Sequence, residues 1–177
     1  MSTQPSVTNT NPGCIHTILE LFGLVPEPLP YKKKGRLLSN TELSFYQVLK
    51  SISAGRFAIC AKVRMADILT IGHTRNYYRH FNRIAQKHID FLLCNPDTME
   101  IIAAIELDDS SHNSGSRQDR DYFVKTALDA AQIPLIRFPA RRTYNTQEIA
   151  EQIKLTLERA SQPPISQTGN IARNQSG

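Results

Sequence analysis

Apolar residues recur along the chain at two spacings, one typical of helices and the other of strands. Ser39–Glu42 forms a capping-box sequence ahead of a helical apolar pattern that stops at Gly55, which predicts the first helix of the fold. Residues 57–65 follow with the alternation typical of a strand. The positions expected to face the interior are Leu43, Tyr46, Val48 and Leu49 in the helix and Ile59, Ala61 and Val63 in the strand.

The second half of the chain predicts a hairpin followed by a helix, a strand and a final helix. Strands at 88–94 and 100–108 flank the turn sequence Asn-Pro-Asp-Thr, and the second strand is apolar on both faces until Glu106, as in the centre of a sheet. Residues 74–86 predict a basic helix or an ordered loop. A helix at 117–131, a buried strand at 134–139 and a helix from the Asn145 cap to 159 complete the pattern. The helix positions expected to face inward are Phe123, Leu128, Ala131, Ile149, Ile153, Leu155 and Leu157.

The order α-β-(α)-β-β-α-β-α predicts an α/β fold with a mixed central sheet flanked by helices. The folded domain is expected to span residues 36–160. Residues 1–35 are expected to form a flexible arm, within which 15–24 is compatible with a short helix. The polar segment 161–177 predicts a disordered tail.

The composition suits a globular chain with one folded domain. The sequence has 177 residues, of which 40% are apolar and 21% charged. No apolar run approaches the roughly 20 residues that span a bilayer. The run at 14–25 is interrupted by polar residues and follows no Lys or Arg, so we expect no signal peptide. Cys14, Cys60 and Cys94 are far apart in sequence, which argues against a disulfide framework or a zinc ribbon and fits a reducing cytoplasm.

Positive charge is concentrated in one block. Residues 31–87 contain twelve Lys or Arg and only Glu42 and Asp67 as acids, within a chain of net charge +5. Such a block suits the phosphate backbone of a nucleic acid, whereas a solvated basic face is the simpler alternative. The cations expected to contact nucleic acid are Lys32, Lys33, Lys34, Arg36, Lys62, Arg64, Arg75, Arg79 and Arg83, with Arg120 further along the chain.

Acidic residues cluster on and just after the predicted hairpin. Asp90 lies in the first strand, and Glu106, Asp108 and Asp109 end the second. Carboxylates within apolar strands are costly to bury without a cation, and their oxygens suit Mg²⁺ or a similar hard ion. The alternative is that Asp90 pairs with Lys87 or an arginine, while Asp108 and Asp109 begin a loop and cap the next helix.

Four further residues extend this candidate site, each with a simpler alternative. His112 suits a general acid or base, although a loop histidine is more often only exposed. Glu42 is explained by the capping box, yet a carboxylate in the first helical turn could also point into the cleft. Lys125 could contact phosphate or pair with Asp121 along the helix. Arg137, in a buried strand, requires an anion, which could be a core acid or a phosphate.

The sequence resembles the restriction-endonuclease-like, or PD-(D/E)xK, superfamily in its order of elements and its Asp–hairpin–Glu pattern. ELDDSSH at 106–112, RQDRDYFVK at 117–125 and IPLIRF at 133–138 resemble an uncharacterised bacterial domain family within that fold. That family is itself similar to the very-short-patch-repair endonucleases. RLLSNTELSFYQVL and VRMADIL, expected as a strand at 63–69, extend the resemblance over about 36–157.

The resemblance implies an αβββαβ core in which Asp90 and Glu106 hold the metal ion and Glu42 is the superfamily's helix glutamate. It also implies a lysine at the position occupied here by Asp108. An anion cannot stabilise the negative charge that develops during phosphodiester hydrolysis, so another cation or base must substitute. His112 is the first choice for that role and Lys125 the second, because the short-patch-repair relatives also use histidine.

The sequence therefore predicts a DNA endonuclease or a nuclease-like repair protein that depends on Mg²⁺ or Mn²⁺, with RNA as an alternative substrate and no membrane partner. The catalytic residues would be Asp90, Glu106, Asp108, His112 and Lys125, with Glu42 as a further metal ligand. Two other classes stay open. One is a catalytically inactive nucleic-acid-binding module with a nuclease fold, and the other is a protein-interaction domain that docks through residues 14–25. The substrate form and the oligomeric state are not predicted.

Overall fold

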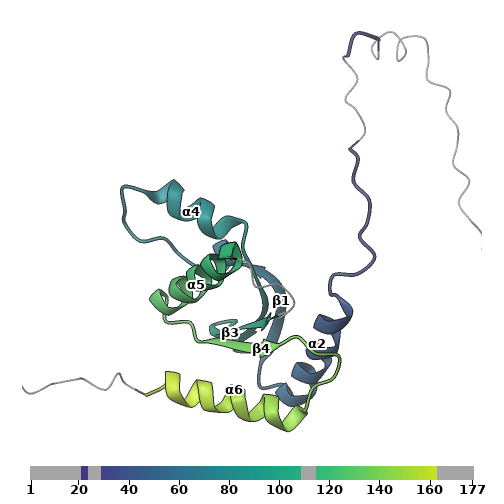
Figure 1. Cartoon of the computed structure of the whole chain (residues 1–177), viewed down its shortest axis with the longest axis vertical. Coiled ribbons are helices and arrows are strands. Elements are labelled where there is room, and N and C mark those ends of the chain that lie inside the picture. The colour runs from purple at the N-terminus through teal and green to yellow at the C-terminus, as the bar shows by residue number, and fades with distance from the viewer. Residues whose placement is uncertain (1–20, 24–28, 109–114, 163–177) are drawn as a thin grey trace, which may run out of the picture. The chain divides into compact units, whose positions relative to one another are not determined.

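The computed structural model describes residues 21–23, 29–108 and 115–162, and these ranges divide between two units (Figure 1). The first unit, Met1–Leu37, contains the lysines at 32–34, and the second, Leu38–Gly177, contains the strands of the sheet. Most of the expected helix at 15–24, together with Asp109, His112 and the tail from 163 onward, lies outside the described residues. None of the described helices combines the length and apolar character required to cross a bilayer.

Four strands form one mixed sheet in the spatial order β1-β2-β3-β4. They are β1 (Ala58–Arg64), β2 (His88–Cys94), β3 (Ile101–Asp108) and β4 (Leu135–Pro139). The first three strands are antiparallel neighbours, and β4 lies parallel to β3. The expected mixed sheet is thus confirmed, and β3 is a central strand because β2 and β4 pair with its two edges.

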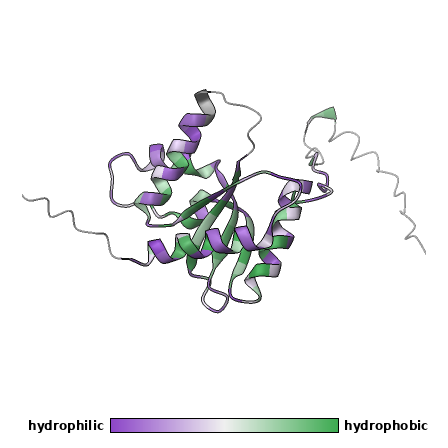
Figure 2. Cartoon of the chain, turned by 60° about the horizontal axis from the view of Figure 1, so that its bottom comes forward, coloured by the Kyte–Doolittle hydropathy of each residue, from purple (hydrophilic) through white to green (hydrophobic). Residues whose placement is uncertain are grey.

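Helices pack on both faces of this sheet (Figures 1 and 2). The core on one face joins α2 (Asn40–Ser53) and α6 (Thr146–Ala160) to the strands through Phe45, Phe91 and Ile153. The core on the other face joins α5 (Gly115–Ala130) to the strands through Val124 and Leu128. Figure 2 shows the apolar strands between these helices, whose outer faces are largely hydrophilic. Two shorter helices, α3 (Met65–Ile68) and α4 (Tyr77–Ala85), connect β1 to β2.

Local sequence signals explain where the long helices begin and end. The Ser39 hydroxyl accepts a hydrogen bond from the Glu42 N–H, and the Glu42 carboxylate accepts one from the Ser39 N–H, so the expected capping box is confirmed. At the other end, Ala54 and Gly55 both have a left-handed backbone, with φ of 43° and 83°, which terminates α2. Asn145 caps α6 by accepting from the backbone N–H groups of the first turn.

Several positions differ from the expected burial. Leu43 and Leu155 are 38% and 41% exposed, and Ala131 is also exposed, whereas Phe45 and Val124 are fully buried. Residues one position apart on a helix differ in direction by about 100°, so a small error in the assumed phase moves a side chain from core to solvent. The core set was therefore predicted only in part.

The segment expected to be a strand at 63–69 is also different. The strand stops at Arg64, and the next four residues form α3. Val63 packs on the α5 side of the sheet, away from the face that Ile59 and Ala61 share. The intervening residue, Lys62, has a left-handed backbone with φ of 57°, which interrupts the regular alternation of side chains along β1.

Candidate active site

A row of four charged residues crosses the sheet, one from each strand. The β1–β2 register places Lys62 level with Asp90, and the β2–β3 register places Asp90 level with Glu106. Glu106 in turn pairs directly with Arg137 across the parallel β3–β4 ladder. The order of charges along the row is therefore positive, negative, negative, positive, with the two carboxylates on the central strands.

Lys62 joins two carboxylates that are far apart in sequence. Its ammonium group donates hydrogen bonds to Glu42 Oε1 and, at 2.8 Å, to Asp90 Oδ1. Burial lowers the pKa of Lys62, but the hydrogen bonds and charges of Asp90 and Glu42 outweigh that effect, and the net pKa is raised. Burial likewise raises the pKa of Glu42, and the hydrogen bonds from Lys62 and Ser39 reverse this to a net lowering. Lys62 and Glu42 are therefore both ionised at neutral pH.

The Lys62 backbone is itself unusual. A lysine with φ of 57° lies in the left-handed region, which is unfavourable for residues other than glycine and is retained where the surrounding structure over-determines it. Here the two ion pairs with Glu42 and Asp90 hold the side chain between α2 and β2. The local geometry thus places a cation beside Asp90.

Arg137 holds the other end of the row. Its guanidinium group lies 3.0 Å from Glu106 Oε2, 3.2 Å from Asp108 Oδ1 and 3.8 Å from Asp121 Oδ2. The expectation that Arg137 requires an anion is confirmed, and the anion is the acidic cluster itself. One guanidinium group forms ion pairs with three carboxylates, so this end of the site carries an excess of negative charge.

The pKa of Glu106 is shifted mainly by burial and, to a smaller extent, by that excess. Its side chain is 11% exposed, and burial raises its pKa to about 7. The charge of Arg137 opposes this rise, while the charges of Asp90, Asp108 and Asp121 reinforce it. A carboxyl group with a pKa near neutrality at the edge of a cavity is a frequent property of functional sites.

A small recess of about 70 Å³ opens beside Asp90 and Glu106. The Leu107 N–H donates to Asp90 Oδ2 at 3.0 Å and thereby fixes that carboxylate against β3. The recess is large enough for an ion with water, since a single water requires about 10–15 Å³ by a comparable measure. Its lining consists of His88, Asp90, Glu106, Leu107, Asp108, Arg120 and Asp121.

The donor set of the recess fits a hard divalent cation. No cluster of three or more His, Cys, Asp or Glu with metal-ligand geometry occurs within residues 29–108 and 115–162. Mg²⁺, however, commonly takes one or two carboxylates and completes its shell with water and phosphate oxygens. Asp90 and Glu106 provide two carboxylates on neighbouring strands and line one recess, so they are the residues that would hold such an ion.

The other sequence-predicted residues differ in their relation to the recess. Arg120 lines the recess, whereas Glu42 contacts Lys62 and does not line it. Lys125, expected as a catalytic residue, does not line the recess and pairs on the exposed side of α5 with Asp129, whereas the alternative partner considered was Asp121. Arg64 pairs with Asp67. Lys87, an expected alternative partner of Asp90, lies over the Phe123 ring instead, as does Arg83.

Three residues of the site were not assigned to it from the sequence. Lys62 was expected only as a contact for nucleic acid, and Asp121 only as a salt-bridge partner on its own helix. His88 was overlooked, although its place two residues before Asp90 puts it on the same side of β2 by strand alternation. No local pattern marks Lys62, because its role depends on the register between β1 and β2.

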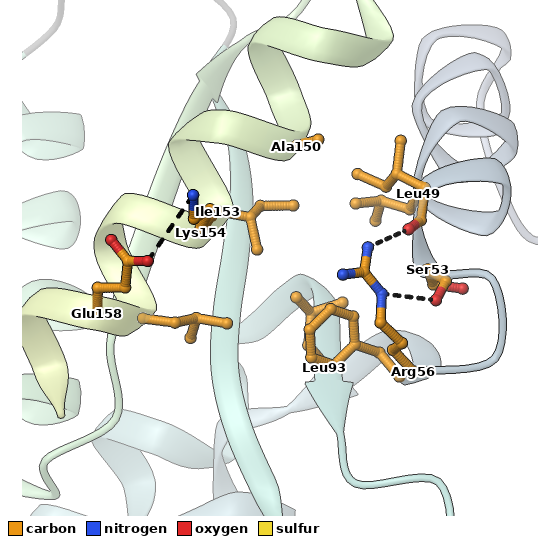
Figure 3. Close-up of a pocket in the computed structure, with 11 residues that line it drawn as sticks. Leu49, Ser53, Arg56, Leu93, Ala150, Ile153, Lys154 and Glu158 are labelled. Atoms are coloured by element: carbon orange, nitrogen blue, oxygen red, sulfur yellow. Dashed lines mark hydrogen bonds and ion pairs between the residues drawn. The ribbon is translucent and has the colours of Figure 1, made fainter.

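A second hollow, of about 220 Å³, lies on the opposite face of the sheet between α2 and α6 (Figure 3). Its lining is mainly apolar, and its charged groups have partners at the rim. Arg56 donates to the Ile52 and Ser53 carbonyls, and Lys154 lies 3.9 Å from Glu158. This hollow lacks the paired carboxylates of the recess, so we do not assign it to phosphate chemistry.

Two cysteines that are distant in sequence also meet in the fold. Cys60 and Cys94 are free thiols on β1 and β2, and both contribute to the core beneath α5. Burial raises the pKa of the Cys94 thiol, and the neighbouring Cys60 adds to this effect. The proximity of this pair was not expected from the sequence.

Comparison with known proteins gives a family assignment without an activity. Residues 34–157 match the family described as Protein of unknown function (DUF2726). The chain matches none of the curated proteins and none of the solved structures. The match covers the whole sheet and all but the last turn of α6. The chain therefore belongs to the DUF2726 family.

Proposed function

We propose that this protein is a metal-dependent nuclease that hydrolyses phosphodiester bonds in DNA or RNA. The observation that carries the proposal is the pair Asp90 and Glu106, level on adjacent strands beside a recess and flanked by Lys62 and Arg137. The order of elements would correspond to the αβββαβ core of the restriction-endonuclease-like superfamily if α3 and α4 are an insertion between its first two strands. Reduced Cys60 and Cys94 fit the proposed cytoplasmic location.

Asp90 and Glu106 would hold Mg²⁺ or Mn²⁺, and the ion when bound would polarise the scissile phosphate and acidify its water. The chain's own groups have separate roles. Arg120 at the recess supplies positive charge that neutralises the phosphate. Arg137 keeps Glu106, Asp108 and Asp121 together despite their mutual repulsion.

Lys62 would take the role of the superfamily's lysine, whose position is occupied here by Asp108. Its ammonium group contacts Asp90 from β1, so a positive charge stands beside the metal-binding carboxylate although none is available at position 108. Glu42 acts as a positioning residue, because its carboxylate contacts both the Ser39 N–H and Lys62. His88 is the histidine that lines the recess within the described residues, and we assign proton transfer to it, with His112 as the alternative.

A catalytically inactive nucleic-acid-binding module is the second candidate. The observation that favours it is that Asp90 and Glu106 each have their own cationic partner, Lys62 and Arg137. In that case the acids would stabilise the sheet, and nucleic acid would bind without divalent ions. Binding that falls steeply with salt and does not change with Mg²⁺ would identify this class.

The test combines metal binding with cleavage. The full chain should bind Mn²⁺ by calorimetry and cleave at least one of single-stranded DNA, nicked duplex, mismatched duplex or RNA. The double variant Asp90→Asn/Glu106→Gln, which keeps the shape but removes both charges, should lose metal affinity and activity by at least about 100-fold, the scale for removing essential catalytic groups. Lys62→Met should retain metal binding but lose most of the activity.

Asp97→Asn is the matched control, because it removes an exposed carboxylate from the turn between β2 and β3. It should leave both measurements unchanged. If no substrate is cleaved with either ion, and if the double variant binds Mn²⁺ as the parent does, the nuclease proposal is wrong. Metal-independent binding of nucleic acid would then support the second candidate.

A further inference from the structure

Aromatic rings and arginines share the surface of α4 and the adjoining part of α5. Tyr78 is 78% exposed and Tyr122 is 74% exposed, which are large exposed fractions for aromatic side chains. We define this aromatic–arginine surface by Arg75, Tyr77, Tyr78, Arg79, Phe81 and Tyr122.

The rings of α4 form a connected cluster. Tyr77 stacks on Phe81 with centroids 6.2 Å apart and planes within 9°, as expected for residues four positions apart on a helix. Tyr78 meets Tyr77 edge to face at 5.6 Å. These contacts orient the three rings relative to one another, and Tyr77 and Phe81 keep 47% and 38% of their surface exposed. Exposed ring faces are suited to stacking against other planar groups.

The charges in the sequence around the α4 rings are of one sign, whereas Tyr122 on α5 follows Asp119 and Asp121. No Asp or Glu occurs between Asp67 and Asp90, a segment that holds four Lys or Arg. Within the described part of the chain, Arg75 and Arg79 form no ion pair. An aromatic surface bordered by unneutralised arginines is complementary to a ligand that offers both planar apolar faces and anions.

A groove adjoins this surface, and Tyr122 belongs to its lining. It lies between α4 and α5, has a volume of about 850 Å³ and is lined by His80, Arg83, Tyr122 and Phe123, with Asp119 as one acid among them. The neighbouring α5 residues Arg120 and Asp121 line the recess. On the other wall, α4 leads through Gln86 and Lys87 directly to His88.

We propose that the aromatic–arginine surface binds a single-stranded segment of nucleic acid, with bases stacked on its rings and phosphates on its arginines. Duplex DNA keeps its bases paired and stacked, so it could use only the arginines. Single strands offer both contacts, and base stacking on aromatic side chains is their general mode of recognition. The inference names the substrate class of the proposed nuclease. It rests on that function only for the cleavage step, since binding itself requires no catalysis.

The test measures binding of the full chain by fluorescence anisotropy with EDTA present, so that cleavage plays no part. The probes are a labelled single-stranded DNA, an RNA of the same sequence and the matching DNA duplex. The chain should bind one of the single strands at least about tenfold more tightly than the duplex. Tyr78→Ala/Tyr122→Ala should weaken single-strand binding by roughly tenfold or more, on the scale known for stacked bases, and should leave duplex binding unchanged.

Tyr78→Phe/Tyr122→Phe is the matched control, because it keeps both rings and should bind as the parent does. Both positions are exposed, and circular dichroism checks that the variants fold. Equal affinity for single strand and duplex, or an alanine variant that binds single strands normally, would overturn the inference and favour a protein partner for the rings. Binding as expected without cleavage by the metal-loaded protein would instead contradict the nuclease proposal alone.

Discussion

At the scale of single residues, the site depends on side chains that perform two tasks at once. Glu42 completes a capping box and also pairs with Lys62, so it has a structural role and a contact at the candidate site together. Arg137 satisfies a core acid and also gathers Asp108 and Asp121. The sequence indicated that Arg137 needs an anion, but the identity of that anion depends on β3–β4 pairing, which no local pattern contains.

Glu106 gives a pH-dependent prediction. Its pKa is raised from 4.5 to about 7 by burial, so the folded protein retains a proton that the unfolded chain releases between these values. The free energy of unfolding should therefore fall as pH rises through that window. Glu106→Gln removes the titration. The free energy of unfolding of the Glu106→Gln variant, relative to that of the parent, should increase by on the order of 3 kcal/mol between pH 4.5 and pH 8.

Urea unfolding in EDTA at both pH values measures this difference. Glu151→Gln, which removes an exposed carboxylate on α6, controls for the general effect of the charge change. If the difference in the free energy of unfolding between Glu106→Gln and the parent stays constant with pH, Glu106 does not titrate as the structure indicates.

At the scale of elements, the sequence identified the helices and strands better than it identified their faces. Turn residues and caps are local, so the hairpin, α2 and α6 could be predicted from short motifs. The short helix α3 was missed because four residues are too few to show a helical period. The direction of Val63 was wrong because the left-handed backbone of Lys62 is fixed by tertiary contacts.

The cap of α2 gives the second prediction. Ser39→Ala removes the oxygen that accepts the Glu42 N–H and should lower the free energy of unfolding by about 1 kcal/mol. Because Glu42 also contacts Lys62, the same change should modestly reduce the proposed nuclease activity. Thermal unfolding and cleavage assays measure the two effects.

The matched control is Ser51→Ala in the last turn of the same helix, where the hydroxyl only donates to the Val48 carbonyl. That change should leave stability unaltered or slightly improved, because alanine favours helix more than serine does. If Ser39→Ala and Ser51→Ala lower the free energy of unfolding equally, the cap makes no specific contribution to stability.

At the scale of the whole molecule, charge is distributed over both units of the chain. The lysines at 32–34 belong to the first unit, whereas the recess and the aromatic–arginine surface belong to the second. The excess of basic residues in 31–87 could be read from the sequence. The sequence did not predict which of these basic residues form ion pairs, which lie over aromatic rings and which remain unpaired. Each partner is set by the folded arrangement and not by a local motif.

The first unit gives the third prediction. Lys32→Ala/Lys33→Ala/Lys34→Ala should weaken binding to nucleic acid and reduce the slope of log affinity against log salt by up to about 2, since each lost phosphate contact on a single strand contributes roughly 0.7. Anisotropy titrations over a range of salt concentrations measure the slope. Folding should be unaffected, because the core residues of the sheet lie between Phe45 and Ile153.

Lys50→Ala/Lys125→Ala/Lys154→Ala changes the net charge by the same amount at positions outside the 32–34 lysines. Its effect on the slope should be clearly smaller. An equal loss in the two triple variants would show that overall charge, and not the location of these lysines, governs affinity.

The parallel strand β4 has a consequence for how the molecule is assembled. It comes last in the chain among the strands of the sheet, and it brings Arg137 to the acidic row. During synthesis, the meander of β1, β2 and β3 emerges first, and its clustered anions then lack the guanidinium that offsets them. The complete row of charges therefore forms only once α5 and β4 have docked, and a product interrupted after β3 should be poorly stable and should lack the proposed activity.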